Sequence, residues 1–238
     1  NPHARSRSLP PEGAVSGFGR PGATDMRASL IGRFLLLSIF WLLLLLPAWY
    51  WAARWLAVPP IWLAGTAMKA LFSWVDGFHQ EGVTAVLQTL VQVRMKGAQG
   101  DVLGELAPEV SYPSYGYGLV LLWAMLLAAR TEKWWWKGLI GSLLLLPAQA
   151  WGICFQWLRD VMLLSGPSAA AYLNYPRWAG EAVAYGYQFG FLMLTPMAPI
   201  LLWLLFNQRF LAALWLEAAL EQAPEARVEA PTQAVDKR

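Results

Sequence analysis

This sequence of 238 residues contains very little cysteine, histidine or charge. It has one Cys and two His, and only 14% of its residues are charged. A disulfide framework, a zinc ribbon and a cysteine-ligated iron–sulfur cluster all need more thiols, and two histidines are too few for a multi-histidine metal site. We therefore expect no metal or other cofactor. A soluble domain carries about 25% charged residues, so this deficit predicts an integral membrane protein in contact with a lipid bilayer.

Several signatures of catalysis and nucleic-acid binding are also missing. The chain has no Walker-type phosphate loop and no HExxH, GxSxG or CxxCH motif. No apolar run carries an acid in its middle that could relay protons or act in an intramembrane aspartyl protease. The net charge is +3, but the basic residues are dispersed and form no stripe. These absences argue against nucleic acid as a partner and leave few routes to enzymatic activity.

Hydrophobic residues make up 57% of the chain and are concentrated in long runs. Crossing about 30 Å of hydrocarbon takes roughly 20 apolar residues in a helix, which satisfies its own backbone hydrogen bonds. The sequence therefore predicts an all-α membrane protein with about four transmembrane helices, at residues 30–56, 115–129, 138–158 and 185–206.

A fifth and shorter apolar run covers residues 61–75. Pro59 and Pro60 separate it from the first predicted span, and its apolar positions recur at helical spacing. Its length and its polar residues, Lys69 among them, favour an interfacial or re-entrant helix over a fifth span.

Charged residues beside the predicted spans indicate their direction, because cytoplasmic loops are enriched in Lys and Arg. The link between the second and third spans, RTEKWWWK, carries three basic residues against one acid, and Arg27 and Arg33 precede the first span. Arg209 follows the fourth span. The segment 76–112 instead holds five acids against two basic residues. These charges predict a multi-pass protein with both termini in the cytoplasm and segment 76–112 outside.

The two ends of the chain differ in composition from its middle. Residues 1–29 are rich in Arg, Ser, Pro and Gly, which predicts a disordered or non-native N-terminal arm. Residues 30–214 form the predicted polytopic membrane domain. An amphipathic helix is expected after the fourth span, and residues 215–238 contain its end and a disordered cytoplasmic tail.

One outer segment has the alternation of a β-hairpin. Residues 89–95, TLVQVRM, alternate apolar with polar side chains, and Gly97 and Gly100 supply a turn into DVLGELAPEV. We expect a small extracytoplasmic hairpin within residues 83–110. Because a lone hairpin is marginally stable in water, it should lie against the membrane face, the 61–75 helix or a partner.

Two pairs of predicted spans share short sequences. LLLLPAWYW in the first span resembles LLLLPAQAW in the third, and YGYG in the second resembles YGYQ in the fourth. Either an internal duplication, with two proline kinks facing each other, or composition alone explains these matches. Small residues and amides in membrane helices pack closely or hydrogen-bond to neighbouring helices. The residues predicted to pack the helices are Pro47, Trp51, Pro147, Trp151, Gly116, Gly118, Gly186, Gln149, Gln156 and Gln188.

Three residues could together form a reactive site. Cys154 lies near the outer end of the third predicted span, Arg159 follows it, and His79 lies in the outer segment. A nearby guanidinium can lower the pKa of a thiol, and a histidine can act as its base. The alternative is that Cys154 is a small hydrophobic residue between helices and His79 an ordinary loop residue.

A second set of ionisable residues lies at the predicted outer boundary of the membrane. Arg159 and Asp160 follow the third span, and Arg54 has the corresponding place on the first. Such residues mark a partner contact, a binding site or a contact with lipid headgroups. They also extend to the interface without binding anything, and both interpretations stay open.

The order of these segments resembles a known family. A Leu-rich first span running into PAWYWAARWL, an outer hairpin, YGYGLVLLWAMLLA, LLPAQAWGICFQWL and YGYQFGFLMLTPMAPILLWL, between Arg33 and Leu214, resemble the exosortase H-associated membrane proteins. The resemblance implies a bacterial inner-membrane protein that assists a transpeptidase-like enzyme, which cleaves C-terminal sorting tails. It implies a partner and not a reaction. The sorting enzymes use a Cys, an Arg and a His on membrane helices, whereas here His79 precedes Cys154 and Arg159.

The leading hypothesis is a non-enzymatic accessory subunit of the inner membrane, whose outer loops and helix faces bind an exosortase-type enzyme or its substrate tail. One alternative is a cysteine-dependent membrane transpeptidase or protease that uses Cys154, His79 and Arg159. Another is a small structural subunit of a larger transport or redox complex in the membrane, which Trp-rich spans would also suit.

Overall fold

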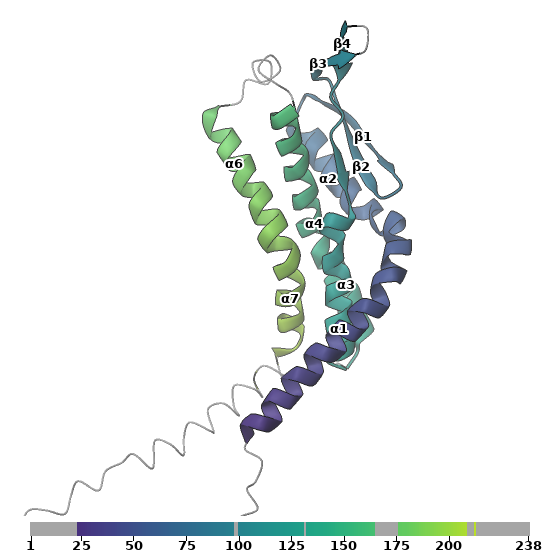
Figure 1. Ribbon diagram of the computed structural model, residues 1–238, viewed down its shortest axis with the longest axis vertical. Coiled ribbons are helices and arrows are strands. Elements are labelled where there is room, and N and C mark those ends of the chain that lie inside the picture. Colours follow the sequence, from purple (N-terminus) through teal and green to yellow (C-terminus); the bar gives the residue numbers. More distant parts are fainter. Residues whose placement is uncertain (1–22, 98–99, 131, 165–175, 209–211, 213–238) are drawn as a thin grey trace, which may run out of the picture.

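The computed structural model of the chain describes residues 23–97, 100–130, 132–164, 176–208 and 212. Long helices form a bundle, and the described strands gather at one end of it (Figure 1). The helices are α1 Ala23–Leu56, α2 Val58–Leu71, α3 Pro113–Ala128, α4 Trp134–Leu164, α6 Arg177–Gln188 and α7 Thr195–Phe206, with a π-helix, η1, at Phe189–Leu194.

Three helical stretches are long and apolar enough to cross a membrane, within the residues that the structure describes. They are Gly32–Leu56 in α1, Trp134–Leu163 in α4, and Trp178–Phe206, which joins α6, η1 and α7. The apolar helix α3 has 16 residues, which at 1.5 Å each give about 24 Å, less than a hydrocarbon core of about 30 Å. The prediction of a mostly helical membrane protein is confirmed, whereas the helix lengths do not establish the count of four spans.

The helices α4 and α6 extend beyond the predicted spans. α4 continues through Arg159 and Asp160 to Leu164, and α6 begins at Arg177. Much of the stretch between the third and fourth predicted spans, residues 159–184, is therefore helical. Arg159 and Asp160 do not end the helix, because Arg159 Nη2 lies 2.7 Å from Asp160 Oδ1 and each charge has its partner within the helix.

At the N-terminal side, α1 begins at Ala23. The last residues of the predicted arm, 1–29, are thus helical. Residues 1–22 and 213–238, which include the predicted tail at 215–238, lie outside the described part of the chain.

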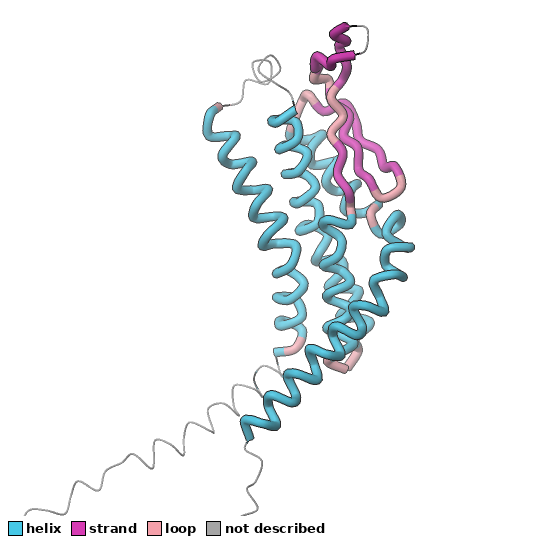
Figure 2. Tube along the Cα trace, viewed as in Figure 1, coloured by secondary structure: helices cyan, strands magenta, loops and turns pink. Residues whose placement is uncertain are grey.

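Within the described residues, five strands form two small antiparallel sheets at one end of the bundle, and β1 of the three-stranded sheet packs against α2 (Figure 2). One sheet has the order β1-β2-β5, and the other pairs β3 with β4. The predicted hairpin with its turn between Gly97 and Gly100 is confirmed as β3–β4. The all-α description is corrected, since strands begin at Val75, before the segment 83–110. The strands are β1 Val75–Glu81, β2 Thr84–Thr89, β3 Gln92–Gly97, β4 Gly100–Glu105 and β5 Glu109–Ser111.

The β1–β2 hairpin was missed, although its turn has a sequence signal. Glu81 pairs with Thr84, so the loop consists of Gly82 and Val83, and Gly82 has a positive φ of 63°. Two-residue hairpin loops favour Gly at positions that need a positive φ. A Gly between VDGFHQE and VTAVLQT is therefore the feature that could have identified this hairpin.

The helix predicted at 61–75 is α2, which ends earlier because β1 begins at Val75. Its residues Ile61 and Met68 are buried in one hydrophobic cluster with Trp157 of α4. Trp157 Nε1 also donates a hydrogen bond to the carbonyl oxygen of Ala85 on β2, at 3.3 Å. We call α2 and β1–β5 together the head. An interfacial or re-entrant position of α2 stays a prediction.

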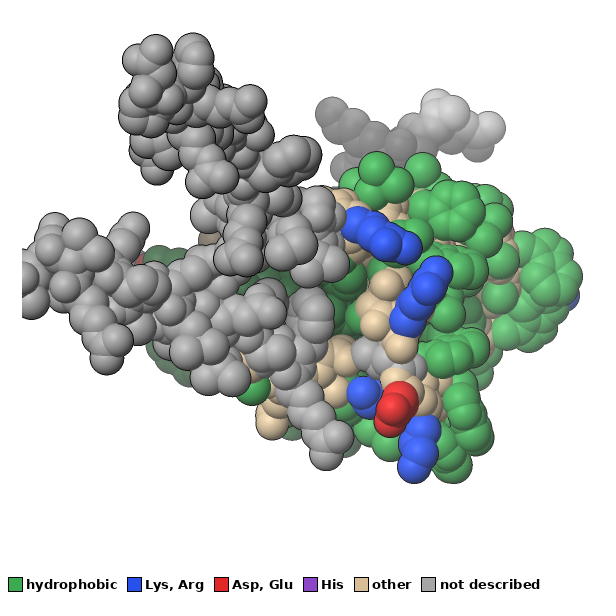
Figure 3. All heavy atoms as spheres, turned by 90° about the horizontal axis from the view of Figure 1, so that it is seen from below, with side chains coloured by type: hydrophobic (Ala, Val, Ile, Leu, Met, Phe, Trp, Pro, Cys, Tyr) green, Lys and Arg blue, Asp and Glu red, His purple; other side chains and the backbone are tan. Residues whose placement is uncertain are grey.

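The opposite end of the bundle brings together α1, α4 and α7. Lys137 Nζ donates a hydrogen bond to the carbonyl oxygen of Phe206 at 3.0 Å, and the rings of Phe34 and Trp203 stack with centroids 5.0 Å apart. Lys and Arg side chains gather at this end (Figure 3), among them those of the α3–α4 turn. We call it the basic end.

The last span changes helix type in its middle. In η1 the chain forms a π-helix, and the hydroxyl of Thr195 donates to the carbonyl oxygen of Gly190, five residues earlier, at 2.8 Å. A π-helix accommodates an additional residue within a turn. α6 packs against α4, whereas α7 packs against both α3 and α4.

Candidate functional site

Cys154 lies where α4 packs against α2. Its side chain is partly exposed, and Sγ donates a hydrogen bond to the carbonyl oxygen of Ala64 at 3.5 Å. Ala64 is fully buried. The thiol is therefore directed into the contact between the two helices, where a small apolar side chain would also fit.

His79 lies on β1 of the head. Its Nε2 is 3.0 Å from Glu81 Oε1, on the same face of the strand, and its side chain is 41% exposed. Among the described residues, no hydrogen bond joins His79, Cys154 and Arg159 to one another; each of the three bonds to a different partner. The hypothetical nucleophile and base are thus in separate contacts, and a hydrogen-bonded pair of the kind that activates a thiol is not formed between them.

Arg159 and Asp160 lie where α4 passes beside α6. The Nη2 and Nε atoms of Arg159 donate to Asp160 Oδ1 at 2.7 and 3.0 Å. The guanidinium carbon of Arg159 lies 4.2 Å from the centroid of the Tyr187 ring. Charge-assisted hydrogen bonds and a cation–π contact both stabilise a guanidinium. Arg159 is therefore held between the two helices.

Further aromatic and amide groups extend this cluster to α3 and η1. The buried Tyr115 of α3 donates its hydroxyl to Gln156 Oε1 at 2.8 Å. The ring of Phe191 meets Tyr115 edge-on and stacks on Tyr187. The motifs YGYG and YGYQ indicate a possible repeat in the sequence, and they give no signal that Tyr115 and Tyr187 lie near Arg159. We call this group the tyrosine–arginine cluster, with members Tyr115, Gln156, Arg159, Asp160 and Tyr187.

Arg54 has separate contacts at the end of α1. Its guanidinium lies 3.9 Å from the centroid of the Trp55 ring. Its carbonyl oxygen accepts a hydrogen bond from Gln80 Nε2 on β1 at 2.6 Å. The sequence placed Arg54 and the Arg159–Asp160 pair in one constellation, but in the structure Arg54 contacts the head while the pair lies between helices.

Several of the predicted packing residues lie at close helix contacts. Trp151 Nε1 donates to the carbonyl oxygen of Gly186 at 3.0 Å, and a Cβ atom on Gly186 would overlap the ring of Phe155. A Cβ atom on Gly118 would lie 2.9 Å from the carbonyl oxygen of Thr195. The predicted packing residues that are buried or hydrogen-bonded between elements are Gly116, Gly118, Gln149, Trp151, Gln156 and Gly186.

Four other predicted packing residues are exposed: Pro47, Trp51, Pro147 and Gln188. Trp51 is 74% exposed. The two prolines are therefore exposed and do not form facing kinks in the bundle interior. A membrane helix that is apolar all round does not mark its inner face in the sequence, which is why these assignments differ from the structure.

The chain was compared with known proteins. Residues 28–210 match the exosortase H-associated membrane protein family. No curated protein and no solved structure matches the chain. The matched stretch includes the head, the tyrosine–arginine cluster and all three candidate spans.

Proposed function

This chain belongs to the exosortase H-associated membrane protein family, and from that premise we propose that it is a non-enzymatic accessory subunit of the bacterial inner membrane. In this proposal the exposed face of the head holds an exosortase-type sorting enzyme or the sorting tail of its substrate. The family name supplies the association with exosortase. The accessory role and the binding surface are our proposal.

We further propose four spans with both termini in the cytoplasm. Lys and Arg are enriched on the cytoplasmic side of membrane proteins, and the basic end of the bundle has this composition (Figure 3). α3 would complete the fourth crossing through its flanking turns, since Tyr112 before it and the turn at 129–130 lengthen the apolar segment. The head then lies on the outer side, where sorting tails would be presented.

The contacts of the reactive side chains support a non-enzymatic role. The Cys154 thiol bonds to Ala64 in the α2–α4 contact, His79 bonds to Glu81, and Arg159 bonds to Asp160. Each group is used in a local structural contact. The hypotheses of a cysteine-dependent enzyme and of a transport or redox subunit receive no comparable support from the described residues.

The binding proposal rests on large apolar side chains that are exposed on the head. Trp62 and Leu71 of α2 are 61% and 74% exposed, and Leu90 between β2 and β3 is 51% exposed. Exposed apolar groups outside the membrane-crossing helices mark sites of interaction, and aromatic residues are enriched in protein interfaces. We therefore assign the exosortase contact to this surface.

The test is co-expression of the tagged chain with exosortase H, gentle solubilisation and quantification of the recovered enzyme. Replacing Trp62 and Leu71 by Ser should lower exosortase recovery about tenfold or more, as expected when interface anchors are lost. The matched control is Trp51→Ser, an equally exposed side chain on α1, which should leave recovery unchanged. Equal recovery with all variants would contradict the assigned surface.

A second measurement separates the accessory role from catalysis. Cys154→Ala in the same cells should leave processing of a sorted substrate unchanged, because the thiol serves only in packing. Loss of processing while exosortase is still recovered with the Cys154→Ala chain would refute the non-enzymatic role.

A further inference from the structure

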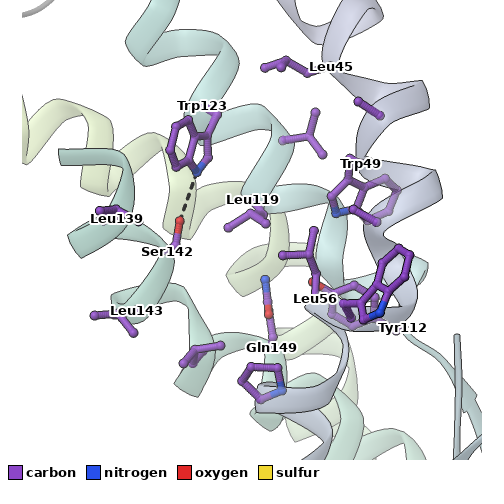
Figure 4. A pocket seen from close by; sticks show the side chains of 16 residues that line it. Leu45, Trp49, Leu56, Tyr112, Leu119, Trp123, Leu139, Ser142, Leu143 and Gln149 are labelled. Atoms are coloured by element: carbon purple, nitrogen blue, oxygen red, sulfur yellow. Dashed lines mark hydrogen bonds between the residues drawn. The ribbon is translucent and has the colours of Figure 1, made fainter. Parts of the chain in front are cut away.

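A groove runs along one side of the bundle between α1, α3 and α4. α1 and α4 each pack on α3, and an open volume of about 480 Å³ lies between their facing sides. Leu119 and Trp123 of α3 form the floor of this groove. Trp49 lies on its α1 wall, and Leu139 and Leu143 lie on its α4 wall (Figure 4).

The walls of the groove belong to helices that are long and apolar enough to cross a membrane. The α1 wall is part of the stretch Gly32–Leu56, and the α4 wall is part of Trp134–Leu163. Leu139 and Leu143 are 45% and 66% exposed, so they form an open rim. The groove therefore opens sideways, toward the hydrocarbon of the bilayer.

The side chain of Gln149 on α4 points into the groove (Figure 4). It is 4% exposed, and its amide makes no hydrogen bond to any residue that the structure describes. By contrast, Ser142 on the same wall donates to the carbonyl oxygen of Gly138 and accepts from Trp123 Nε1. An unsatisfied polar group is unfavourable in hydrocarbon, so the Gln149 amide calls for a partner that enters the groove.

The depth of Gln149 limits what this partner can be. The nearest charged residues of α4 are Lys137 and Arg159, 12 and 10 residues away, which is about 18 Å and 15 Å along the helix. The centre of a hydrocarbon core about 30 Å thick lies about 15 Å from each surface, so the amide lies near the middle of the membrane. Lipid headgroups and esters stay at the surfaces, and an acyl chain has no atom that could hydrogen-bond to the amide.

A transmembrane helix of another chain does bring polar groups to this depth. Its backbone bonds are internal, but Asn, Gln, Ser and Thr side chains form hydrogen bonds between membrane helices. The α1 wall has a second feature of helix interfaces. Ala48 and Ala52 are four residues apart and both line the groove, and small residues at this spacing let helix backbones approach closely. The buried amide and the small pair together favour a helix as the occupant.

A second copy of this chain fits the groove less well. Because Gln149 is buried inside a concave surface, two copies related by a two-fold axis cannot bring their Gln149 amides together. Inserting a different helix of the second copy would be a head-to-tail contact, which continues into filaments unless the rotation closes a ring. The occupant is therefore expected to be a different protein.

We propose that the groove binds one transmembrane helix of the exosortase-type enzyme, and that an amide or hydroxyl side chain of this helix hydrogen-bonds to Gln149 in the middle of the membrane. The helix packs closely on Ala48 and Ala52 and covers Leu143. This inference rests on the proposed function, because it takes the exosortase as the partner. It adds a contact within the membrane to the contact on the head.

The first test places the photocrosslinking residue p-benzoylphenylalanine at Leu143 in the full chain, which is co-expressed with exosortase H and irradiated in intact membranes. Peptide mass spectrometry should locate the crosslink in a transmembrane helix of the enzyme. The same residue at Leu201, which is 56% exposed on α7 and outside the groove, should give only background crosslinking.

Two variants test the features of the groove by the amount of exosortase H recovered with the chain. Gln149→Leu should lower recovery by about threefold to tenfold, the effect of one hydrogen bond between membrane helices. Ala48→Leu should lower recovery by about fivefold or more, because added bulk prevents close packing. Ala48 is itself exposed, so the larger side chain meets the partner and not the core of this chain.

Matched controls come from α6. Gln188→Leu and Ala184→Leu change exposed residues outside the groove and should leave recovery unchanged. Circular dichroism and monodisperse elution identify any variant that fails to fold. If Gln149→Leu fails to fold, Ala48→Leu and the crosslink at Leu143 decide the outcome.

The failure of this inference differs from the failure of the proposed function. Absence of exosortase H from the purified wild-type chain would refute both. Recovery that depends on Trp62 and Leu71 but not on Gln149 or Ala48, with background crosslinking at Leu143, would refute the groove and leave the contact on the head. A crosslink from Leu143 to a second copy of the chain, or to the sorting tail of a substrate, would overturn the assignment to the enzyme.

Discussion

The interior of the head and the outer faces of the bundle place large apolar residues in opposite ways. Leu87 of β2 is fully buried, and Met68 of α2 is 1% exposed; the fully buried Trp157 of α4 packs with them. On α1, Leu36 and Trp51 are 70% and 74% exposed. In the proposed orientation, water drives apolar groups together in the head, whereas lipid is as apolar as a leucine side chain and gives helices no such driving force.

Within the bundle, close backbone approach and a few hydrogen bonds join the helices in addition to a buried apolar cluster that contains Leu122 and Trp203. Gly186 allows α6 to approach Phe155 of α4, and its carbonyl oxygen accepts from Trp151 Nε1. Tyr115 reaches Gln156 from α3. The comparison teaches that buried volume stabilises both regions, and that the bundle depends in addition on small residues and single polar contacts between helices.

The largest expected effect is the loss of a buried side chain beside the head. Trp157→Ala should lower the free energy of unfolding by about 3–5 kcal/mol, because a cavity replaces the indole. Thermal unfolding in detergent, followed by circular dichroism, measures the change. Trp51→Ala, on the exposed face of α1, should cost no more than about 0.5 kcal/mol. Similar losses for the two tryptophans would break the distinction between the regions.

An intermediate effect is expected where helices approach at a glycine. Gly186→Ala places a methyl group against the Phe155 ring, and the repacking should cost about 1–3 kcal/mol. Gly180→Ala on the same helix meets nothing within 4 Å and should stabilise α6 by up to about 1 kcal/mol. The two variants are compared by their melting temperatures. A gain in stability with Gly186→Ala would mean that α6 does not depend on this close approach.

The smallest effect should come from one hydroxyl in the tyrosine–arginine cluster. Tyr115→Phe removes the hydrogen bond to Gln156, which should lower the free energy of unfolding by about 1 kcal/mol. Tyr185→Phe is the control, since Tyr185 is 71% exposed. Unfolding measured under the same conditions should separate the two, and equal stability would show that polar contacts contribute little to the bundle.

Much of the fold was predictable because membrane thickness sets the length of apolar runs. The Leu-rich runs identified the cores of α1 and α4, and Gly97 and Gly100 identified the β3–β4 hairpin. The strand β1 was missed because VDGFHQE has few apolar residues; its pairing with β2 and its contact with α2 through Phe78 place it in the head. Its fold depends on a tertiary contact that the local sequence does not contain.

The candidate site was less predictable than the fold. In the sequence, the two charges of Arg159 and Asp160 suggest the end of a helix. In the structure, the Asp160 carboxylate and the Tyr187 ring on another helix both contact Arg159, and α4 continues past the pair. Gln149 was recognised as an amide that needs a partner. Its place beside a pocket follows from how α1 and α4 pack on α3, which the sequence does not specify.

The π-helix η1 changes the direction in which residues of the last span face their neighbouring helices. Each residue of an α-helix is rotated by about 100° from the previous one, so an additional residue in one turn rotates everything after it by that angle. Before η1, Gly186 is directed at Phe155 of α4; after it, Thr195 and Pro199 are directed at Gly118 of α3. The last span therefore shifts its rotational phase midway: both of its halves pack on α4, and the half after η1 packs on α3 as well.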